Sequence, residues 1–254
     1  MVIRVHALTH TGAVRSSNED TVAVDDWIAA NDLTRPKVFE LNLDAPHGVF
    51  AADGMGGHPG GDVASHAVMR FAAARAPAVA DVGTATDLLC DANAHLYDLM
   101  AVGEGPPGMG TTLAGLVVRR DGVVVLNVGD SKVYRFDPEG GLVQLSYDDT
   151  PGPRCRDGRT AAHTTPMLSQ CLGGQSRKTP VTPHAGLWPP LSGARYLVCT
   201  DGLSDLVAPS RLAGILARHD DAPAVAAMFD DAMAQGGRDN ITIALVSGMV
   251  GPGL

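Results

Sequence analysis

The sequence predicts an α+β protein in which helices cover packed β-sheets. The chain has 30 glycines and 17 prolines in 254 residues, above the usual combined share of about 12%, and this excess indicates many turns between short strands. Its content of 45% hydrophobic and 19% charged residues is typical of an ordinary globular protein. The expected order is early strands, two helices, a strand meander and two more helices, which favours helices packed on sheets.

Four segments come before residue 53. Residues 2–11 alternate loosely between apolar and polar side chains and are predicted to form a strand, with a second, shorter strand at residues 21–27. Residues 30–47 contain two prolines together with Asn and Asp, so they are predicted to be a surface loop. Residues 48–52 are an apolar run that predicts a short buried strand.

Two helices are expected next. The first covers residues 62–76, with Asp62 at the positive N-terminal end. The second begins at about Thr86, because apolar side chains then recur every four residues. These side chains are Leu88, Ala92, Leu96 and Met100.

The second half of the chain is predicted to consist mainly of strands. The whole chain, residues 1–254, is predicted to form one domain. The pair Asp121-Gly122 between two apolar runs predicts a β-hairpin. Residues 148–165 are polar and rich in Pro and Gly, which predicts a mobile flap. The remaining expected elements are strands at residues 133–136, 142–145, 196–200 and 241–246 and helices at about 209–218 and 222–235.

Charge and hydropathy exclude several classes of function. The formal net charge of −9 disfavours sequence-independent binding to nucleic acid, which needs a basic face. No apolar run approaches ~18 residues and the start lacks the apolar region of a signal peptide, so a cytoplasmic protein without a membrane role is expected. The four cysteines are far apart and are predicted to be reduced thiols. They are Cys90, Cys155, Cys171 and Cys199.

Carboxylates recur at the ends of the expected strands. Asp53, Asp130 and Asp201 each follow an apolar strand and adjoin a glycine. Asp239 precedes the last strand, and Glu19-Asp20 precedes the second. A single Asp-Gly is usually only a turn, and spacing alone does not show that these positions meet.

If these six carboxylates do meet, their charge of −6 needs a counter-charge. Two divalent cations would leave −2, and a third would neutralise the cluster. Because the set contains only oxygen ligands, it favours Mg²⁺ or Mn²⁺ over Zn²⁺.

Six short motifs occur in the order seen in one family. The chain resembles the metal-dependent, type 2C protein serine/threonine phosphatases in their compact bacterial form, from about residue 4 to 247. The motifs are Arg15-Ser-Ser-Asn-Glu-Asp20, Ala52-Asp-Gly-Met-Gly-Gly-His58, Gly108-Met-Gly-Thr-Thr112, Val128-Gly-Asp-Ser131, Cys199-Thr-Asp-Gly-Leu-Ser-Asp205 and Gly236-Gly-Arg-Asp-Asn-Ile-Thr242.

The resemblance implies a central sandwich of two antiparallel sheets flanked by pairs of helices, with a metal cleft at one end. It implies that Asp53 bridges two Mn²⁺ or Mg²⁺ ions, assisted by the Gly54 carbonyl. The other implied metal residues are Asp201 and Asp239 at one ion, Glu19 and Asp20 around the second, and Asp130 with Asp201 at a third, looser ion. Arg15 matches the position that binds the phosphate, where a guanidinium grips two oxygens.

The implied chemistry is hydrolysis of phosphoserine and phosphothreonine by a metal-bridging hydroxide, without a phospho-enzyme. The proton donor to the leaving oxygen is open. Where eukaryotic members have His directly after Asp-Gly, this chain has Met55, so His58 and a metal-bound water are both candidates. Asp148 and Asp149, where the family often has Asp-His, are expected either to face the substrate or to be solvated.

The resemblance implies a phosphorylated protein substrate, a cognate Ser/Thr kinase and a monomeric enzyme. The run from Met167 to Gly174 resembles a subgroup whose target is a forkhead-associated-domain protein. Two alternatives are a catalytically inactive phosphoprotein-binding relative and another two-metal hydrolase. A dinucleotide site is disfavoured because Pro59 stands where the glycine motif needs Gly.

Overall fold

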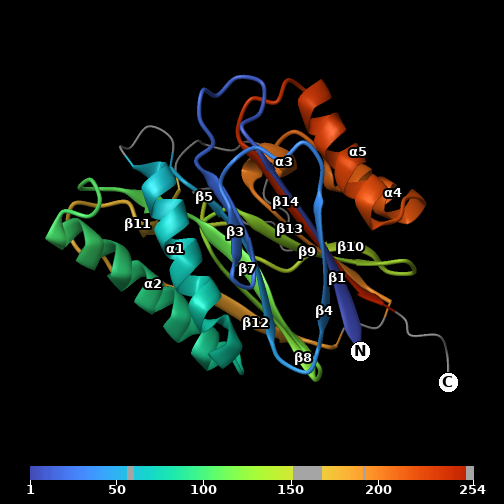
Figure 1. Cartoon of the computed structure of the whole chain (residues 1–254), viewed down its shortest axis with the longest axis horizontal. Coiled ribbons are helices and arrows are strands. Elements are labelled where there is room, and N and C mark those ends of the chain that lie inside the picture. The colour runs from blue at the N-terminus through green and yellow to red at the C-terminus, as the bar shows by residue number, and fades with distance from the viewer. Residues whose placement is uncertain (56–59, 151–167, 191–192, 250–254) are drawn as a thin grey trace.

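Two six-stranded antiparallel sheets lie face to face in the computed structural model, with one pair of helices on each outer side (Figure 1). The structure describes residues 1–55, 60–150, 168–190 and 193–249. Helices α1 and α2 cover one sheet, and α4 and α5 cover the other. The predicted α+β sandwich with helix–sheet–sheet–helix layers is therefore confirmed.

The first sheet has the strand order β10-β9-β13-β14-β1-β4. Its strands are β1 (Val2–His10), β4 (Lys37–Asn42), β9 (Lys132–Asp137), β10 (Gly141–Gln144), β13 (Arg195–Cys199) and β14 (Ile241–Met249). The first and last long strands, β1 and β14, are neighbours through the whole of β1, from Val2 opposite Met249 to His10 opposite Ile241.

The second sheet has the strand order β12-β8-β7-β5-β2-β3. Its strands are β2 (Asp20–Val24), β3 (Trp27–Ala29), β5 (His47–Asp53), β7 (Leu113–Arg119), β8 (Gly122–Val128) and β12 (His184–Trp188). The predicted hairpin at Asp121-Gly122 joins β7 to β8 and is confirmed. A separate two-stranded ribbon pairs β6 (Gly110–Thr111) with β11 (Leu172–Gly173).

Among the described helices, α2 has the clearest start signal in the sequence. The described helices are α1 (Gly61–Arg75), α2 (Val82–Val102), α3 (Asp201–Ser204), α4 (Pro209–Arg218) and α5 (Asp221–Ala234), with a 3-10 turn η1 (Ala76–Ala78). Asp81 caps α2 through the backbone N–H of Thr84, whose own side chain accepts the Asp81 N–H. None of the described helices combines the length and the apolar character that a membrane crossing requires.

Three apolar layers hold the sandwich together. The middle layer lies between the sheets and consists mainly of small and β-branched side chains such as Val5, Val49 and Val198. One outer layer joins α1 and α2 to the second sheet, and the other joins α4 and α5 to the first. Because most core strands are buried on both faces, they read in the sequence as continuous apolar runs.

Four sequence assignments need correction. The single strand predicted at residues 21–27 is two antiparallel strands, β2 and β3, joined by a turn at Asp25 and Asp26. Residues 30–47, predicted as a loop, contain the edge strand β4, which pairs with β1. Strand β12, with His184 at its start, is absent from the expected strands, although it pairs along β8. Helix α2 begins at Val82, four residues before the expected start, because the Asp81 cap lies ahead of the apolar repeat. Of the expected flap, residues 151–165 lie outside the described part of the chain.

Candidate active site

A cavity of about 920 Å³ opens at one end of the two sheets. Seven of the eight predicted site residues line it, namely Arg15, Glu19, Asp53, Gly54, Asp130, Asp201 and Asp239. Asp205 lines it as well. The structure thus brings together carboxylates that are spread over more than 200 residues of sequence.

Strand directions explain why these side chains meet. Asp20 begins β2 and Asp53 ends the antiparallel β5, and the two are directly paired in register. Strand β8 runs parallel to β5, since each is antiparallel to β7, so Asp130 emerges at the same end. In the other sheet Asp201 follows β13 and Asp239 precedes its antiparallel neighbour β14. All of these chain ends therefore lie on one side of the sandwich.

The Asp53 backbone is fixed by the neighbouring motif. The Thr112 hydroxyl accepts a hydrogen bond from the Asp53 N–H at 3.0 Å, and the Thr111 hydroxyl donates to the Asp53 carbonyl at 2.7 Å. Gly54 follows where no side chain fits, because a Cβ there would lie 2.3 Å from the Gly61 carbonyl oxygen. The pair Asp53-Gly54 is thus held by the start of α1 and by the strand that precedes β7.

Asp20 lies beneath the cavity instead of lining it. Its side chain is fully buried, and one oxygen, Oδ2, accepts a hydrogen bond from the Thr200 hydroxyl at 2.7 Å. The other oxygen, Oδ1, has no hydrogen-bond partner among the described residues. Burial raises the pKa of Asp20 to about 7. Asp20 therefore supports Thr200, the residue just before Asp201, from below.

The aspartates at the centre of the cavity resist ionisation. Burial raises the pKa of Asp53 well above its ordinary value, and the charges of neighbouring aspartates raise it further. Burial, followed by the charges of Asp130 and Asp205, raises the pKa of Asp201 to about 8. Such a cluster becomes stable in its ionised form only with a positive counter-charge.

Two carboxylates beside the central aspartates also have raised pKa values. Burial raises the pKa of Asp130 to about 6, although the nearby Lys132 ammonium acts in the opposite direction. Burial and then the charge of Asp62 raise the pKa of Glu19. The demand for positive charge therefore extends from the central aspartates to Asp130 and Glu19.

Arg15 is the one cation among the described residues that line this cavity. Its guanidinium donates to Asp239 Oδ2 at 2.7 Å, while Asp239 Oδ1 accepts the Asn240 N–H at 2.9 Å. Asn240 also accepts the Glu19 N–H at 2.8 Å, so it ties the chain before β2 to the chain before β14. Arg15 lies at the cavity mouth, about half exposed, where it can meet an anion.

The donor set fits divalent cations in chemistry. No three His, Cys, Asp or Glu side chains within the described ranges form a group that could hold an ion as they stand. Several carboxylate oxygens accept hydrogen bonds from the protein instead: Asp239 from Arg15, and Asp20 from Thr200. Asp201 Oδ1 is buried without a hydrogen-bond partner at the cavity. Unpaired carboxylate oxygens with raised pKa values are what Mg²⁺ or Mn²⁺ would satisfy.

The opposite wall of the cavity was not predicted. It consists of residues 168–181, of which Gln170, Cys171, Gly173, Gly174, Gln175 and Thr179 are among those that face the cavity. Sequence reasoning noted only the family-like run that ends at Gly174. The adjacent glycines Gly173 and Gly174 were the one further sequence signal of a tight turn in this wall. Both have positive φ in the structure.

Asp148 and Asp149 are neither substrate-facing nor solvated, contrary to both expectations. Asp148 pairs with Lys132 at 3.2 Å, with both side chains largely buried. Asp149 is buried and accepts the Gly129 N–H at 2.9 Å, and it lies 2.9 Å from His184 Nε2. Asp149 therefore holds the peptide that precedes Asp130, and His184 holds Asp149.

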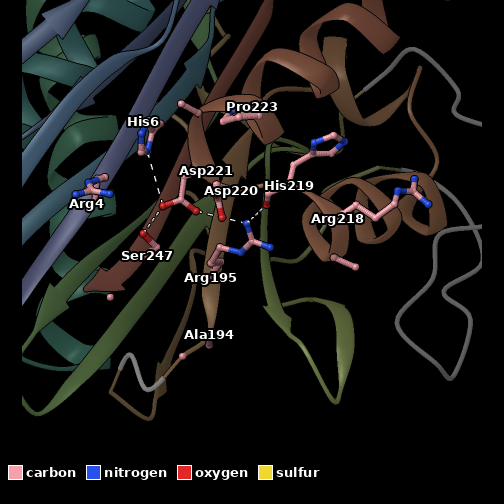
Figure 2. Close-up of a pocket in the computed structure, with 14 residues that line it drawn as sticks. Arg4, His6, Ala194, Arg195, Arg218, His219, Asp220, Asp221, Pro223 and Ser247 are labelled. Atoms are coloured by element: carbon pink, nitrogen blue, oxygen red, sulfur yellow. Dashed lines mark hydrogen bonds and ion pairs between the residues drawn. The ribbon is translucent and has the colours of Figure 1, made fainter. Parts of the chain in front are cut away.

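A second cavity, of about 720 Å³, lies at the other end of the first sheet (Figure 2). Asp221 is at its centre and pairs with Arg195 at 3.4 Å and with the Ser247 hydroxyl at 2.5 Å. His6 Nδ1 is 4.0 Å from the same carboxylate, and Arg218 extends away from this cluster. Arg195 and Ser247 satisfy Asp221, whereas His6 Nδ1 is buried without a hydrogen-bond partner among the described residues. The described residues that line this cavity include only two carboxylates, Asp220 and Asp221, so it lacks the acidic cluster of the first cavity.

Fold and cavity together define a class: an α-β-β-α sandwich protein with an acidic, oxygen-only site suited to divalent cations. The sequence model of the family described as Protein phosphatase 2C matches residues 42–245. The chain therefore belongs to the protein phosphatase 2C family.

Named relatives agree with this assignment. The chain is 30% identical to the serine/threonine protein phosphatase PstP of Mycobacterium tuberculosis over 96% of its own length, but spans only 44% of that protein. It is 28% identical to the serine/threonine phosphatase stp of Listeria monocytogenes, covering 94% of this chain and 93% of the relative. The crystal structure of the PstP catalytic domain with two manganese ions matches with a TM-score of 0.75 and 26% identity, over 97% of this chain and 99% of that one.

Proposed function

We propose that this chain is a metal-dependent protein phosphatase that hydrolyses phosphoserine and phosphothreonine. The observation that carries the proposal is the cavity in which Asp53, Asp130, Asp201 and Asp239 converge from both sheets, with raised pKa values at the centre. The solved PstP domain with two manganese ions supports the use of divalent metal. Retention of these carboxylates disfavours the alternative of an inactive phosphoprotein-binding regulator.

The proposed metal ligands follow the arrangement of the cavity. Asp53 would lie between two Mn²⁺ or Mg²⁺ ions with the Gly54 carbonyl beside it, and Asp201 and Asp239 would complete one site. Glu19 lies toward the second site, and Asp20 would act from beneath. Asp130 together with Asp201 would hold a third, looser ion. When bound, the cations would activate a water molecule that attacks phosphorus, and they would neutralise the charge of the phosphate.

Arg15 would orient the substrate. Its guanidinium donates to Asp239 in this structure. If Asp239 instead binds a metal ion, the guanidinium is free to donate to two phosphate oxygens at once. The cavity gives the phosphorylated side chain a path between the acidic wall and residues 168–181. His58, one candidate donor to the leaving oxygen, lies outside the described residues, so its role stays a prediction.

The biological setting is part of the same proposal. The substrate is a phosphorylated protein, modified by a cognate Ser/Thr kinase in the cytoplasm, and a forkhead-associated-domain protein is one candidate. The relatives named as serine/threonine phosphatases support the substrate class alone.

The direct test is hydrolysis of p-nitrophenyl phosphate and of a phosphothreonine peptide with Mn²⁺, with Mg²⁺ and with EDTA. We expect turnover of both substrates with metal and none after chelation. Folded protein without turnover in either metal would contradict the enzyme assignment and favour the binding regulator, which a phosphopeptide pull-down would then identify.

A further inference from the structure

An exposed turn borders the catalytic cavity on the side opposite the carboxylates. Residues 175–180 form this turn, and all of them are exposed. Gln175 at its start and Thr179 and Pro180 at its end line the cavity. Arg177 and Lys178 lie between these cavity-lining residues, so the turn carries two positive charges at the rim.

The turn has a fixed base. The buried Asn93 of α2 accepts the Gly173 N–H at 2.9 Å and donates to the Thr179 carbonyl at 2.9 Å, so a single side chain holds both ends. The Tyr97 hydroxyl donates to the Gly173 carbonyl at 3.1 Å. Within the turn, the Thr179 hydroxyl donates to the Arg177 carbonyl at 3.0 Å. The rim is therefore positioned by α2 and not only by its own loop.

The two cations of this turn differ from other cations near the cavity in their ion pairing with described residues. Arg15 is paired with Asp239, and Lys132 is paired with Asp148. Arg177 and Lys178 have no ion-pair partner within the described parts of the chain. On a protein with a formal net charge of −9, they form a local positive site next to an acidic cavity.

We propose that this rim selects phosphoprotein substrates with acidic residues flanking the phosphorylated Ser or Thr. The inference rests on the proposed phosphatase function. With the phosphate in the cavity, an extended peptide advances about 3.3 Å per residue, so residues a few positions away pass over the rim. Asp or Glu at those positions meets Arg177 and Lys178, whereas Lys or Arg there is repelled.

The test compares three phosphothreonine peptides that differ only in acidic, neutral or basic flanks, with p-nitrophenyl phosphate as a substrate without flanks. The wild-type protein is expected to show the highest kcat/KM on the acidic peptide, by about three- to tenfold over the neutral one at low salt, with the preference reduced by salt. The double variant Arg177→Ala/Lys178→Ala should lose the acidic preference, and Arg177→Glu/Lys178→Glu should favour the basic peptide.

The matched control is Arg120→Ala/Arg218→Ala, which removes two positive charges outside the cavity and should keep the preference. Equal kcat/KM on all three peptides in the wild-type protein, or a preference unchanged by the charge reversal, would overturn the rim assignment while p-nitrophenyl phosphate is still hydrolysed. Absence of p-nitrophenyl phosphate hydrolysis would instead contradict the phosphatase function, and the rim assignment would fall with it.

Discussion

The two walls of the candidate active-site cavity differ in charge and in what holds them in place. The acidic wall comes from strand ends of both sheets, and burial raises the pKa values of its central carboxylates, Asp53 and Asp201. Asp201 Oδ1 is also buried without a hydrogen-bond partner among the described residues. The wall at residues 168–181 is neutral where it faces the cavity and is held by Asn93, Tyr97 and Gln170. The acidic wall needs a positive counter-charge to be stable in its ionised form, whereas the neutral wall needs no bound ion.

We propose that the acidic wall carries out the reaction and that the neutral wall contacts the substrate. Each carboxylate on the acidic wall is constrained by its neighbours, since a change of one charge alters the pKa values of the others. The neutral wall is held by Asn93 and Tyr97 of α2 and by its own Gln170, none of which contacts the carboxylates in the hydrogen bonds described above. Its exposed turn can therefore change without disturbing the carboxylates. Mutations on the two walls should therefore have different signatures.

The largest effect is expected on the acidic wall, from Asp201→Asn. The change keeps the shape but removes a charge proposed to hold a cation, and a cation supplies several kcal/mol of stabilisation to the transition state. We expect kcat to fall by about a thousandfold or more, since each 1.36 kcal/mol is tenfold. Asp121→Asn, in the exposed β7–β8 hairpin, is the control. A fully active, folded Asp201→Asn protein would contradict the ligand assignment.

Metal removal should make stability depend on pH. The pKa values of about 8 for Asp201, 7 for Asp20 and 6 for Asp130 in the folded, metal-free protein lie above their ordinary value. Folding therefore favours their neutral forms, and this contribution is lost as the pH rises through those values. Between pH 6 and 8.5 in EDTA, we expect Tm to fall by several degrees, measured by thermal unfolding. The fall should be smaller in excess Mg²⁺, and an equal fall would contradict the counter-charge argument.

The same contrast separates what the sequence could predict from what it could not. The acidic wall was predictable because Asp53, Asp130 and Asp201 each follow an apolar strand and occur in ordered motifs. Their convergence was not, since it depends on strand order and direction in two sheets. Asp20 shows the limit of motif matching, because its burial beneath Thr200 depends on a contact across 180 residues.

The neutral wall was missed because its stabilising contacts are distant in sequence and leave no periodic pattern. Gln170 bonds both backbone groups of Thr182, and Asn93 reaches from a helix about 80 residues earlier. Strands β4 and β12 were missed for a related reason. Both are edge strands with mostly exposed or half-buried residues, so they lack the continuous apolar run that identified the central strands.

A smaller effect, on the neutral wall, is expected from Asn93→Ala. The change leaves the Gly173 N–H, on a buried residue, without its partner, which costs about 1–3 kcal/mol. It also releases the Thr179 carbonyl of the exposed turn from α2. We expect a loss of about 2 kcal/mol in the free energy of unfolding, measured in urea, and a higher KM for phosphopeptides with kcat little changed. Asn31→Ala, at an exposed position, is the control. A kcat loss as large as that of Asp201→Asn would contradict the separation of the two walls.

The smallest effect is expected where the walls join, at His184. Its ring stacks on Tyr147 at 4.8 Å and lies 2.9 Å from the buried Asp149, which holds the Gly129 peptide. His184→Leu and His184→Gln both remove the stacking, but Gln keeps an N–H donor. We expect Leu to cost about 1–2 kcal/mol in the free energy of unfolding, and Gln less than half of that, since a hydrogen bond to a charged group contributes about 1.5–3 kcal/mol. Equal losses in urea unfolding would show that stacking, not the bond to Asp149, joins the two walls.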